Sequence, residues 1–351
     1  MFTFAPGPSK VYDSLPIYLN DAYQEGILSA NHRSSAFMKL YQETEQLMRT
    51  KLHMPDDYKL LFTSSSTENW EIVSQSIVER ASFHIYSGSF GKKWFEFARH
   101  ILPASAGLKI EANQSIDVPS LQIGEEFDLI AITQNETSNA SQVRSEVIEA
   151  IRDKFPEKMI AVDTTSSMGG IELDFSLADI WYASVQKCFG LPAGLGILIL
   201  SPKAIEKSER KGEKGRYNSL SFMLENANAY QTHYTPNVLG IYLLNRVLKD
   251  IPMIQEIDAT LRSRMSQLEN CIAQTKTLRM LVDNAETRST TVMGIAGTEE
   301  LITQVKKDAE KAGMQMGGGY GPLKPTSFRI ANFPAITDEE FDVLLEFLKK
   351  Y

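Results

Sequence analysis

A chain of 351 residues is too long for one compact hydrophobic core, so we expect a large domain with a smaller companion. The formal net charge of -8 argues against a nucleic-acid-binding protein, and 43% hydrophobic with 23% charged residues is typical of a globular protein. No apolar run approaches the ~20 residues that a membrane span needs. We therefore expect neither nucleic acid nor a membrane as a partner.

Cysteines, histidines and the first residues bear on location and metal binding. Cys188 and Cys271 form no CxxC pair and cannot build a disulfide framework, which favours a reducing cytoplasm. The first ten residues contain neither the basic nor the apolar region of a signal peptide. The histidines lack the HExxH spacing of a zinc site. We expect a cytoplasmic protein without a metal site, and we interpret the basic stretch at residues 203–216 as a solvated surface loop.

Strand-like and helix-like patterns alternate over the first two thirds of the chain. The expected strands are residues 58–62, 84–86, 129–133, 159–162, 180–185 and 196–200, and the expected helices include residues 68–80, 92–99 and 142–154. Short buried strands separated by amphipathic helices are typical of an α/β fold with a doubly wound, mostly parallel sheet covered on both faces. Such sheets bind ligands at the carboxyl ends of their strands.

After about Asn237 long helical patterns dominate. The expected helices are residues 238–249, 254–274, 299–312 and 338–349, and the expected strands are residues 279–282, 290–294 and 328–331. This pattern predicts a smaller C-terminal α+β domain. We divide the chain into a large domain, residues 14–237, and a small domain, residues 238–351, with residues 1–13 packing near the small one.

Asp163 and Lys187 are the first candidates for chemistry. Asp163 ends the expected strand at residues 159–162, and Lys187 follows the next strand, twenty-four residues later. A pyridoxal 5'-phosphate (PLP) enzyme needs both groups at strand ends beside one cleft, because a carboxylate keeps the pyridine nitrogen protonated while an amine forms a Schiff base with the cofactor. Taken singly, Asp163 is better interpreted as a turn cap and Lys187 as a solvent-exposed side chain. Together they predict a PLP site.

Three polar loops that follow expected strands are consistent with the same cofactor. Ser65, Ser66 and Thr67 precede a helix, where free N–H groups suit a phosphate, although Ser66 or Thr67 is also a candidate N-cap. Phe90 is placed to stack on a pyridine ring, or else to pack in the core. The stretch at residues 135–137 offers short polar groups for the ring hydroxyl.

These motifs resemble those of the class V, fold-type I aminotransferases, and among them most closely the phosphoserine aminotransferase group. The similar stretches are residues 4–8 (FAPGP), 29–34 (SANHRS), 65–67 (SST), 87–90 (SGSF), 134–137 (QNET), 184–187 (SVQK) and 190–194 (GLPAG). The resemblance covers nearly the whole chain and implies the PLP-transferase fold type I. It implies catalytic roles for Lys187 and Asp163. The cofactor-binding residues that it implies are Ser66, Thr67, Phe90, Thr137, Asp163, Gln186, Lys187 and Thr235.

The resemblance also implies substrate and partner residues. Arg329 corresponds to the arginine that binds the substrate α-carboxylate, for which a guanidinium fork is well suited. Stretches like residues 234–236 (YTP) reach the neighbouring subunit's cofactor phosphate in that family, which implies a homodimer with shared active sites. Two features depart from the family pattern. Phe90 replaces the usual tryptophan, and the His-Arg pair that binds the substrate phosphate is absent. Lys324 is the candidate replacement, with His32 and Arg33 of the other subunit.

The resemblance implies transamination between O-phospho-L-serine and 2-oxoglutarate in serine biosynthesis. The alternative is an aminotransferase of non-phosphorylated donors, serine or alanine, with glyoxylate or pyruvate, which the missing phosphate pair favours. A PLP lyase or desulfurase is disfavoured because neither Cys188 nor Cys271 lies in an expected mobile loop. A non-catalytic homologue is disfavoured by the presence of Lys187, Asp163 and Arg329.

Overall fold

Seven strands form the larger sheet of the computed structural model, which describes residues 2–351. The strands are β2 (Lys59–Thr63), β3 (Ala81–Tyr86), β4 (Ala106–Lys109), β5 (Phe127–Thr133), β8 (Met159–Asp163), β9 (Ile180–Ser184) and β10 (Gly196–Leu200), in the order β2-β10-β9-β8-β5-β3-β4. Strand β10 runs antiparallel to both of its neighbours, and the other pairs are parallel. The prediction of a mostly parallel sheet is confirmed.

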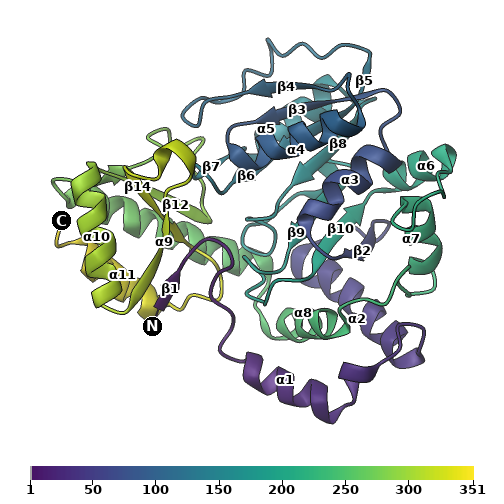
Figure 1. Cartoon of the computed structure of the whole chain (residues 1–351), viewed down its shortest axis with the longest axis horizontal. Helices are drawn as coiled ribbons and strands as arrows, with labels where there is room; N and C mark the ends of the chain where they lie inside the picture. Colours follow the sequence, from purple (N-terminus) through teal and green to yellow (C-terminus); the bar gives the residue numbers. More distant parts are fainter. Residues whose placement is uncertain (1) are drawn as a thin grey trace.

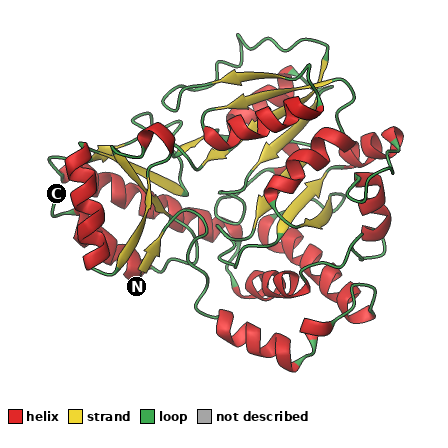
Figure 2. Ribbon diagram, viewed as in Figure 1, coloured by secondary structure: helices red, strands yellow, loops and turns green. Residues whose placement is uncertain are grey.

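The sequence of the central strands explains why the sheet is covered on both faces. Every residue of β8, β9 and β10 is buried, and these strands consist mainly of apolar side chains. A strand that is apolar on both faces must be covered on both, which the intervening helices do (Figure 2). The helices of this part are α1 (Leu15–Gln24), α2 (Ser35–Leu52), α3 (Ser66–Ser76), α4 (Ser89–Ile101), α5 (Ser145–Lys154), α6 (Pro202–Lys211), α7 (Leu220–Ala227) and α8 (Val238–Asp250).

The basic stretch at residues 203–216 was wrongly interpreted as a loop, because most of it forms helix α6. Ser201 caps this helix by accepting a hydrogen bond from the backbone of Ala204, and Gly212 ends it in the left-handed conformation. The N-cap at Ser201 and the glycine at the C-terminal end were the sequence signals for a helix, and the interpretation from charged composition overlooked them. Among residues 2–351, no helix combines the length and the apolar character needed to cross a membrane.

The C-terminal part contains a second sheet of five strands (Figure 1). Its order is β1 (Phe2–Phe4), β13 (Met314–Gly318), β14 (Ser327–Ala331), β12 (Val292–Ala296) and β11 (Arg279–Met280). Helices α9 (Ile254–Gln274), α10 (Glu299–Lys311) and α11 (Asp338–Leu348) flank it. Strand β1 pairs with β13 in parallel, so the first residues of the chain pack on the C-terminal part.

Helix α9 connects the two hydrophobic cores. Ile257 and Leu261 belong to the core around the seven-stranded sheet, whereas Met265 and Leu268 belong to the core of the five-stranded sheet. The buried residues of α8 also belong to the first core. Residues 238–261 therefore pack with the larger sheet. The division into domains 14–237 and 238–351 stays a prediction.

Candidate active site

The carboxyl ends of the parallel strands and one edge of the small sheet border a cleft of about 500 Å³. Strands β5, β8 and β9 end here, at Thr133, Asp163 and Ser184, because parallel neighbours end at the same edge of a sheet. Of the predicted site residues, those that line the cleft are Ser66, Thr67, Phe90, Thr137, Asp163, Gln186, Lys187 and Arg329. The structure therefore brings together eight of the residues singled out from sequence.

Lys187 is buried, with 7% of its surface exposed. Its Nζ donates a hydrogen bond to Thr137 Oγ1 at 2.8 Å and lies 5.5 Å from the centre of the Phe90 ring. Burial lowers the pKa of Lys187 to about 8, although the negative charge of Asp163 opposes the shift. A lysine in this state is a substantial fraction neutral amine near pH 8, which is the form that attacks a carbonyl.

Gly7 provides the space that the lysine side chain needs. A Cβ at this position would lie 3.1 Å from Lys187 Cε, and the φ of Gly7 is +153°. Residues 5–8 of the opening stretch therefore line the cleft.

Asp163 is buried at the end of β8. Its Oδ1 accepts hydrogen bonds from the backbone N–H and the hydroxyl of Thr165, at 2.9 and 2.5 Å. Burial raises the pKa of Asp163, whereas the bonds from Thr165 and the charge of Lys187 favour its ionised form. Only Oδ1 is engaged, so Oδ2 is available to a cationic ring nitrogen.

The loop between β2 and α3 has the features of a phosphate site. Ser65 is the N-cap, accepting a hydrogen bond from the backbone of Glu68, so neither Ser66 nor Thr67 caps the helix as the alternative interpretation had it. Ser66 and Thr67 occupy the first turn of α3 and line the cleft. The N–H of Ser66 donates to Ser184 Oγ at 2.8 Å and that of Glu68 to Ser65 Oγ, so the N–H of Thr67 and the dipole of this helix end are the features that favour an anion.

Phe90 is held in place by a buried carboxylate. Glu136 is fully buried and accepts hydrogen bonds from the backbone N–H groups of Phe90 and Gly91 in the first turn of α4. A carboxylate at a helix N-terminus is stabilised by these donors and by the helix dipole. The sequence analysis missed this role. The Asn-Glu-Thr stretch was noted only for the ring hydroxyl.

Arg329 reaches the cleft from the centre of β14. Its Nε donates to Gly318 O and its Nη1 to Thr137 O, both at 2.8 Å. Its Cζ lies 5.6 Å from the centre of the Tyr320 ring. These contacts fix the guanidinium and leave Nη2 free for a carboxylate. Burial lowers the pKa of Arg329, which still remains far too high for it to lose its charge.

The cleft contains buried polar atoms that a bound PLP would satisfy. Trp70 Nε1 and Thr133 Oγ1 are buried without a hydrogen-bond partner among the described residues, and both residues line the cleft. Buried polar groups of native proteins are rarely left unpaired. With a primary amine, a carboxylate and a helix N-terminus around one cavity, the donor set fits a PLP molecule. Lys187 would hold its aldehyde carbon, Asp163 its ring nitrogen, and Ser66 and Thr67 its phosphate.

Four predicted site residues do not line this cleft. Thr235 and Arg33 are exposed, and His32 is partly exposed in the turn before α2. Lys324 is exposed at the end of a short 3-10 helix, Gly321–Leu323, and its backbone carbonyl accepts from Lys306. Lys324 is therefore not among the residues that line the cleft of its own subunit, and its role in binding the substrate stays a prediction.

A different lysine lies beside the cleft. Lys93 Nζ donates to the hydroxyl of Tyr320 at 3.1 Å and lies 5.7 Å from the centre of the Phe90 ring. Lys93 is not among the site residues predicted from the sequence. The helical spacing from Phe90 to Lys93 was the available signal, since residues three apart share a helix face.

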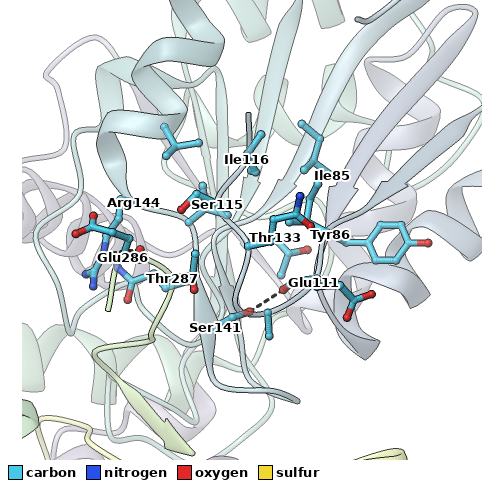
Figure 3. A pocket seen from close by; sticks show the side chains of 17 residues that line it. Ile85, Tyr86, Glu111, Ser115, Ile116, Thr133, Ser141, Arg144, Glu286 and Thr287 are labelled. Carbon is cyan, nitrogen blue, oxygen red and sulfur yellow. Dashed lines mark hydrogen bonds between the residues drawn. The ribbon is translucent and has the colours of Figure 1, made fainter. Parts of the chain in front are cut away.

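A second, small cavity of about 40 Å³ shares the lining residue Thr133 with the cleft (Figure 3). Ser141 also lines this cavity, where its hydroxyl bonds that of Ser87. Arg144 is held by the backbone carbonyls of residues 285, 286 and 288. No lysine lines this cavity, so we do not assign the chemistry to it.

Comparisons with known proteins agree with this site. The family model for class-V aminotransferases matches residues 4–318. The structure of a phosphoserine aminotransferase from Cytophaga hutchinsonii superposes with a TM-score of 0.95 and 34% identity, covering 99% of this chain and 98% of the other. A phosphoserine aminotransferase from Corynebacterium glutamicum is 26% identical, over 97% of this chain and 92% of its own. The alanine–glyoxylate aminotransferase of a Nostoc species, 20% identical with a TM-score of 0.84 over 99% of this chain and 94% of its own, shares the fold.

The fold and the cleft define a PLP-dependent transaminase of fold type I. The chain belongs to the class-V aminotransferase family. Its substrates are accordingly an amino acid and a 2-oxo acid.

Proposed function

We propose that this protein transfers the amino group between O-phospho-L-serine and 2-oxoglutarate, in the biosynthesis of serine. The observation that carries the proposal is the phosphoserine aminotransferase structure that matches at 34% identity over 99% of the chain. The cleft supports it, because Lys187, Asp163 and Arg329 all line one space. We further propose that the protein acts in the cytoplasm.

Each residue of the cleft has a distinct task in this reaction. PLP, when bound, supplies an electron sink for the substrate α-carbon. Arg329 Nη2 binds the substrate α-carboxylate and orients the α-carbon. Asp163 Oδ2 keeps the proton on the ring nitrogen. Lys187 Nζ would hold PLP in the resting enzyme and would accept the proton of the substrate α-carbon during the reaction. Thr137 Oγ1 holds this amine in place at 2.8 Å.

The lowered pKa of Lys187 predicts how cofactor capture depends on pH. Covalent capture of PLP by the cofactor-free chain requires the neutral amine, whose fraction grows as pH rises towards a pKa of about 8. We expect the capture rate to rise about tenfold per pH unit below pH 8 and to level off above it, whereas a free lysine levels off only above about pH 10.4. Stopped-flow absorbance of the cofactor measures this rate. A rate that still rises between pH 9 and 10 would contradict a lowered pKa.

A panel of amino donors tests the substrate proposal. With 2-oxoglutarate as acceptor, we expect phosphoserine to exceed L-serine and L-alanine by at least about tenfold in kcat/KM. One charge-assisted contact to the phosphate contributes roughly 1.5–3 kcal/mol. Half-reactions followed through the absorbance of the bound cofactor separate donor use from acceptor use. An equal or greater rate with alanine would refute the proposal.

The second candidate is an aminotransferase of non-phosphorylated donors. Lys324, His32 and Arg33 are the residues predicted from sequence to bind a substrate phosphate. None of them lines the cleft of its own subunit, which favours this second candidate. Lys93 and the Phe90 and Tyr320 rings beside it counter this argument, since the lysine is exposed at the cleft border. Equal damage to both donors by Lys93→Ala would favour the second candidate, and selective damage to phosphoserine would favour the first.

We propose that the active unit is a homodimer with shared sites. Thr235, His32 and Arg33 support this, because none of them lines its own subunit's cleft. Mixing an inactive Lys187→Ala chain with an inactive His32→Ala, Thr235→Ala double variant is then expected to recover up to about a quarter of wild-type activity. One of the two sites of each heterodimer is intact, and half of randomly paired dimers are heterodimers. Heterodimers confirmed by native mass spectrometry but devoid of activity would contradict shared sites.

A further inference from the structure

A cavity remote from Lys187 lies where the two cores meet. It has a volume of about 310 Å³ and is bordered by the segment before α1, the end of α8, the first part of α9 and Pro334. Ligand sites of small molecules start at about 300 Å³ and favour the junctions between domains. None of its lining residues lines the PLP cleft.

A buried arginine forms part of the cavity wall. Arg264 lines the cavity with 6% of its surface exposed, and its Nε and Nη2 both donate to Asp338 Oδ1, at 2.8 and 2.6 Å. Its Nη1 is buried and has no partner among residues 2–351. The Asp338 side chain is 74% exposed, so water screens its charge and the guanidinium keeps the capacity to bind an anion. Buried N–H groups in native proteins usually have a hydrogen-bond acceptor, so a bound ligand is a candidate acceptor for Arg264 Nη1.

Two acidic side chains also line the cavity. Asp250 and Glu256 line it and are exposed. The hydroxyl of Tyr18 hydrogen-bonds Asp250, which orients that carboxylate. Burial raises the pKa of Tyr12, another lining residue, so its phenol stays neutral and serves as a polar contact without charge. Two carboxylates and a guanidinium that line one cavity suit a zwitterion.

We propose that this cavity is a second ligand site, for a small α-amino acid. Arg264 Nη1 binds its carboxylate, and Asp250 and Glu256 bind its ammonium group. The cavity is large enough for an amino acid of the size of serine or alanine. This inference goes beyond the proposed function and does not depend on which donor the PLP cleft accepts.

The site is connected to the lysine loop through Tyr12. The backbone N–H of Tyr12 donates to Gly190 O at 3.0 Å, and that of Ser9 donates to Gln186 O at 3.1 Å. Gly190 has a φ of +58°, and a Cβ there would lie 2.7 Å from the Tyr12 ring. Tyr12 therefore lies between the cavity and the turn that carries Lys187. A ligand that restrains Tyr12 also restrains this turn.

Titration calorimetry on the holoenzyme tests the site. The PLP cleft is first disabled by Arg329→Gln and by borohydride reduction of the lysine–cofactor bond, so that amino acids no longer react there. With L-serine as the probe, we expect saturable binding of one molecule per chain. Glu256→Gln, an exposed change that leaves Arg264 paired, is expected to weaken it about tenfold. Glu209→Gln, an exposed glutamate of α6 outside the cavity, is the matched control and should change nothing.

The chemistry of the ligand is tested with two relatives of the probe. L-lactate lacks the ammonium group and ethanolamine lacks the carboxylate, so each should bind at least tenfold more weakly than L-serine. Arg264→Gln should abolish L-serine binding. No saturable heat with L-serine, binding unaffected by Glu256→Gln, or equal binding of L-lactate would each overturn the proposal.

Hydrogen exchange provides a second readout in the otherwise unmodified holoenzyme. L-serine should slow amide exchange at residues 9–12 and 186–190, and Glu256→Gln should remove this protection while leaving the PLP cleft intact. Protection that persists in Glu256→Gln would place the effect in the PLP cleft and would overturn the connection through Tyr12.

Discussion

Lys187→Ala is expected to abolish transamination, lowering kcat by roughly 10⁴- to 10⁶-fold, because one group both holds the cofactor and moves the proton. The geometry leaves no substitute within the cleft, since Lys187 is the only lysine among its described lining residues. Borohydride reduction followed by peptide mass spectrometry should find the cofactor on the wild-type peptide that contains Lys187. It should find no adduct in the variant.

Lys93→Ala is the matched control for this prediction. Lys93 Nζ lies 5.7 Å from the same Phe90 ring that Lys187 Nζ approaches to 5.5 Å, but it is exposed rather than buried. Lys93 is exposed and does not line the cleft, so Lys93→Ala should leave the covalent adduct unchanged. An adduct on Lys93, or on any other lysine of the wild-type protein, would refute the assignment of Lys187.

Arg329→Ala is expected to lower kcat/KM about tenfold to more than a hundredfold for every amino donor alike. All donors carry the α-carboxylate, and one charge-assisted contact contributes roughly 1.5–3 kcal/mol. Arg329→Lys should recover only part of the loss, because an ammonium group cannot reproduce a guanidinium that is held by Gly318 O and Thr137 O while binding a carboxylate. The measurement is kcat/KM for phosphoserine and alanine in each variant.

Arg33→Ala separates carboxylate recognition from phosphate recognition. If Arg33 of the partner subunit binds the substrate phosphate, kcat/KM of this variant should fall about tenfold with phosphoserine and hardly change with alanine. The ratio of the two donors should therefore fall in Arg33→Ala and stay constant in Arg329→Ala. A phosphoserine-to-alanine ratio that stays constant in both variants would show that Arg33 does not bind the phosphate.

Local patterns predicted the elements that carry the chemistry. The apolar runs of β8 and β10 and the helical spacing of α9 gave bounds within a residue or two of those observed, since buried strands and long helices have strong periodicity. Helices α1 and α2 and strand β13 were not predicted. Strand β13 contains two glycines in five residues, so its local signal is weak.

The sequence by itself determined the PLP chemistry of this protein, because Asp163, Lys187 and the Ser65–Thr67 loop each follow a strand that its own residues specify. Parallel strands then bring their carboxyl ends to one edge, whatever the rest of the chain does. Only the tertiary structure decided which charges surround the substrate. Lys324 does not line the cleft, and Lys93 is brought beside Tyr320 from 227 residues away in sequence. Glu136 accepts hydrogen bonds from the first turn of α4, 45 and 46 residues away in sequence. Such contacts depend on how separate elements pack, and no local pattern encodes them.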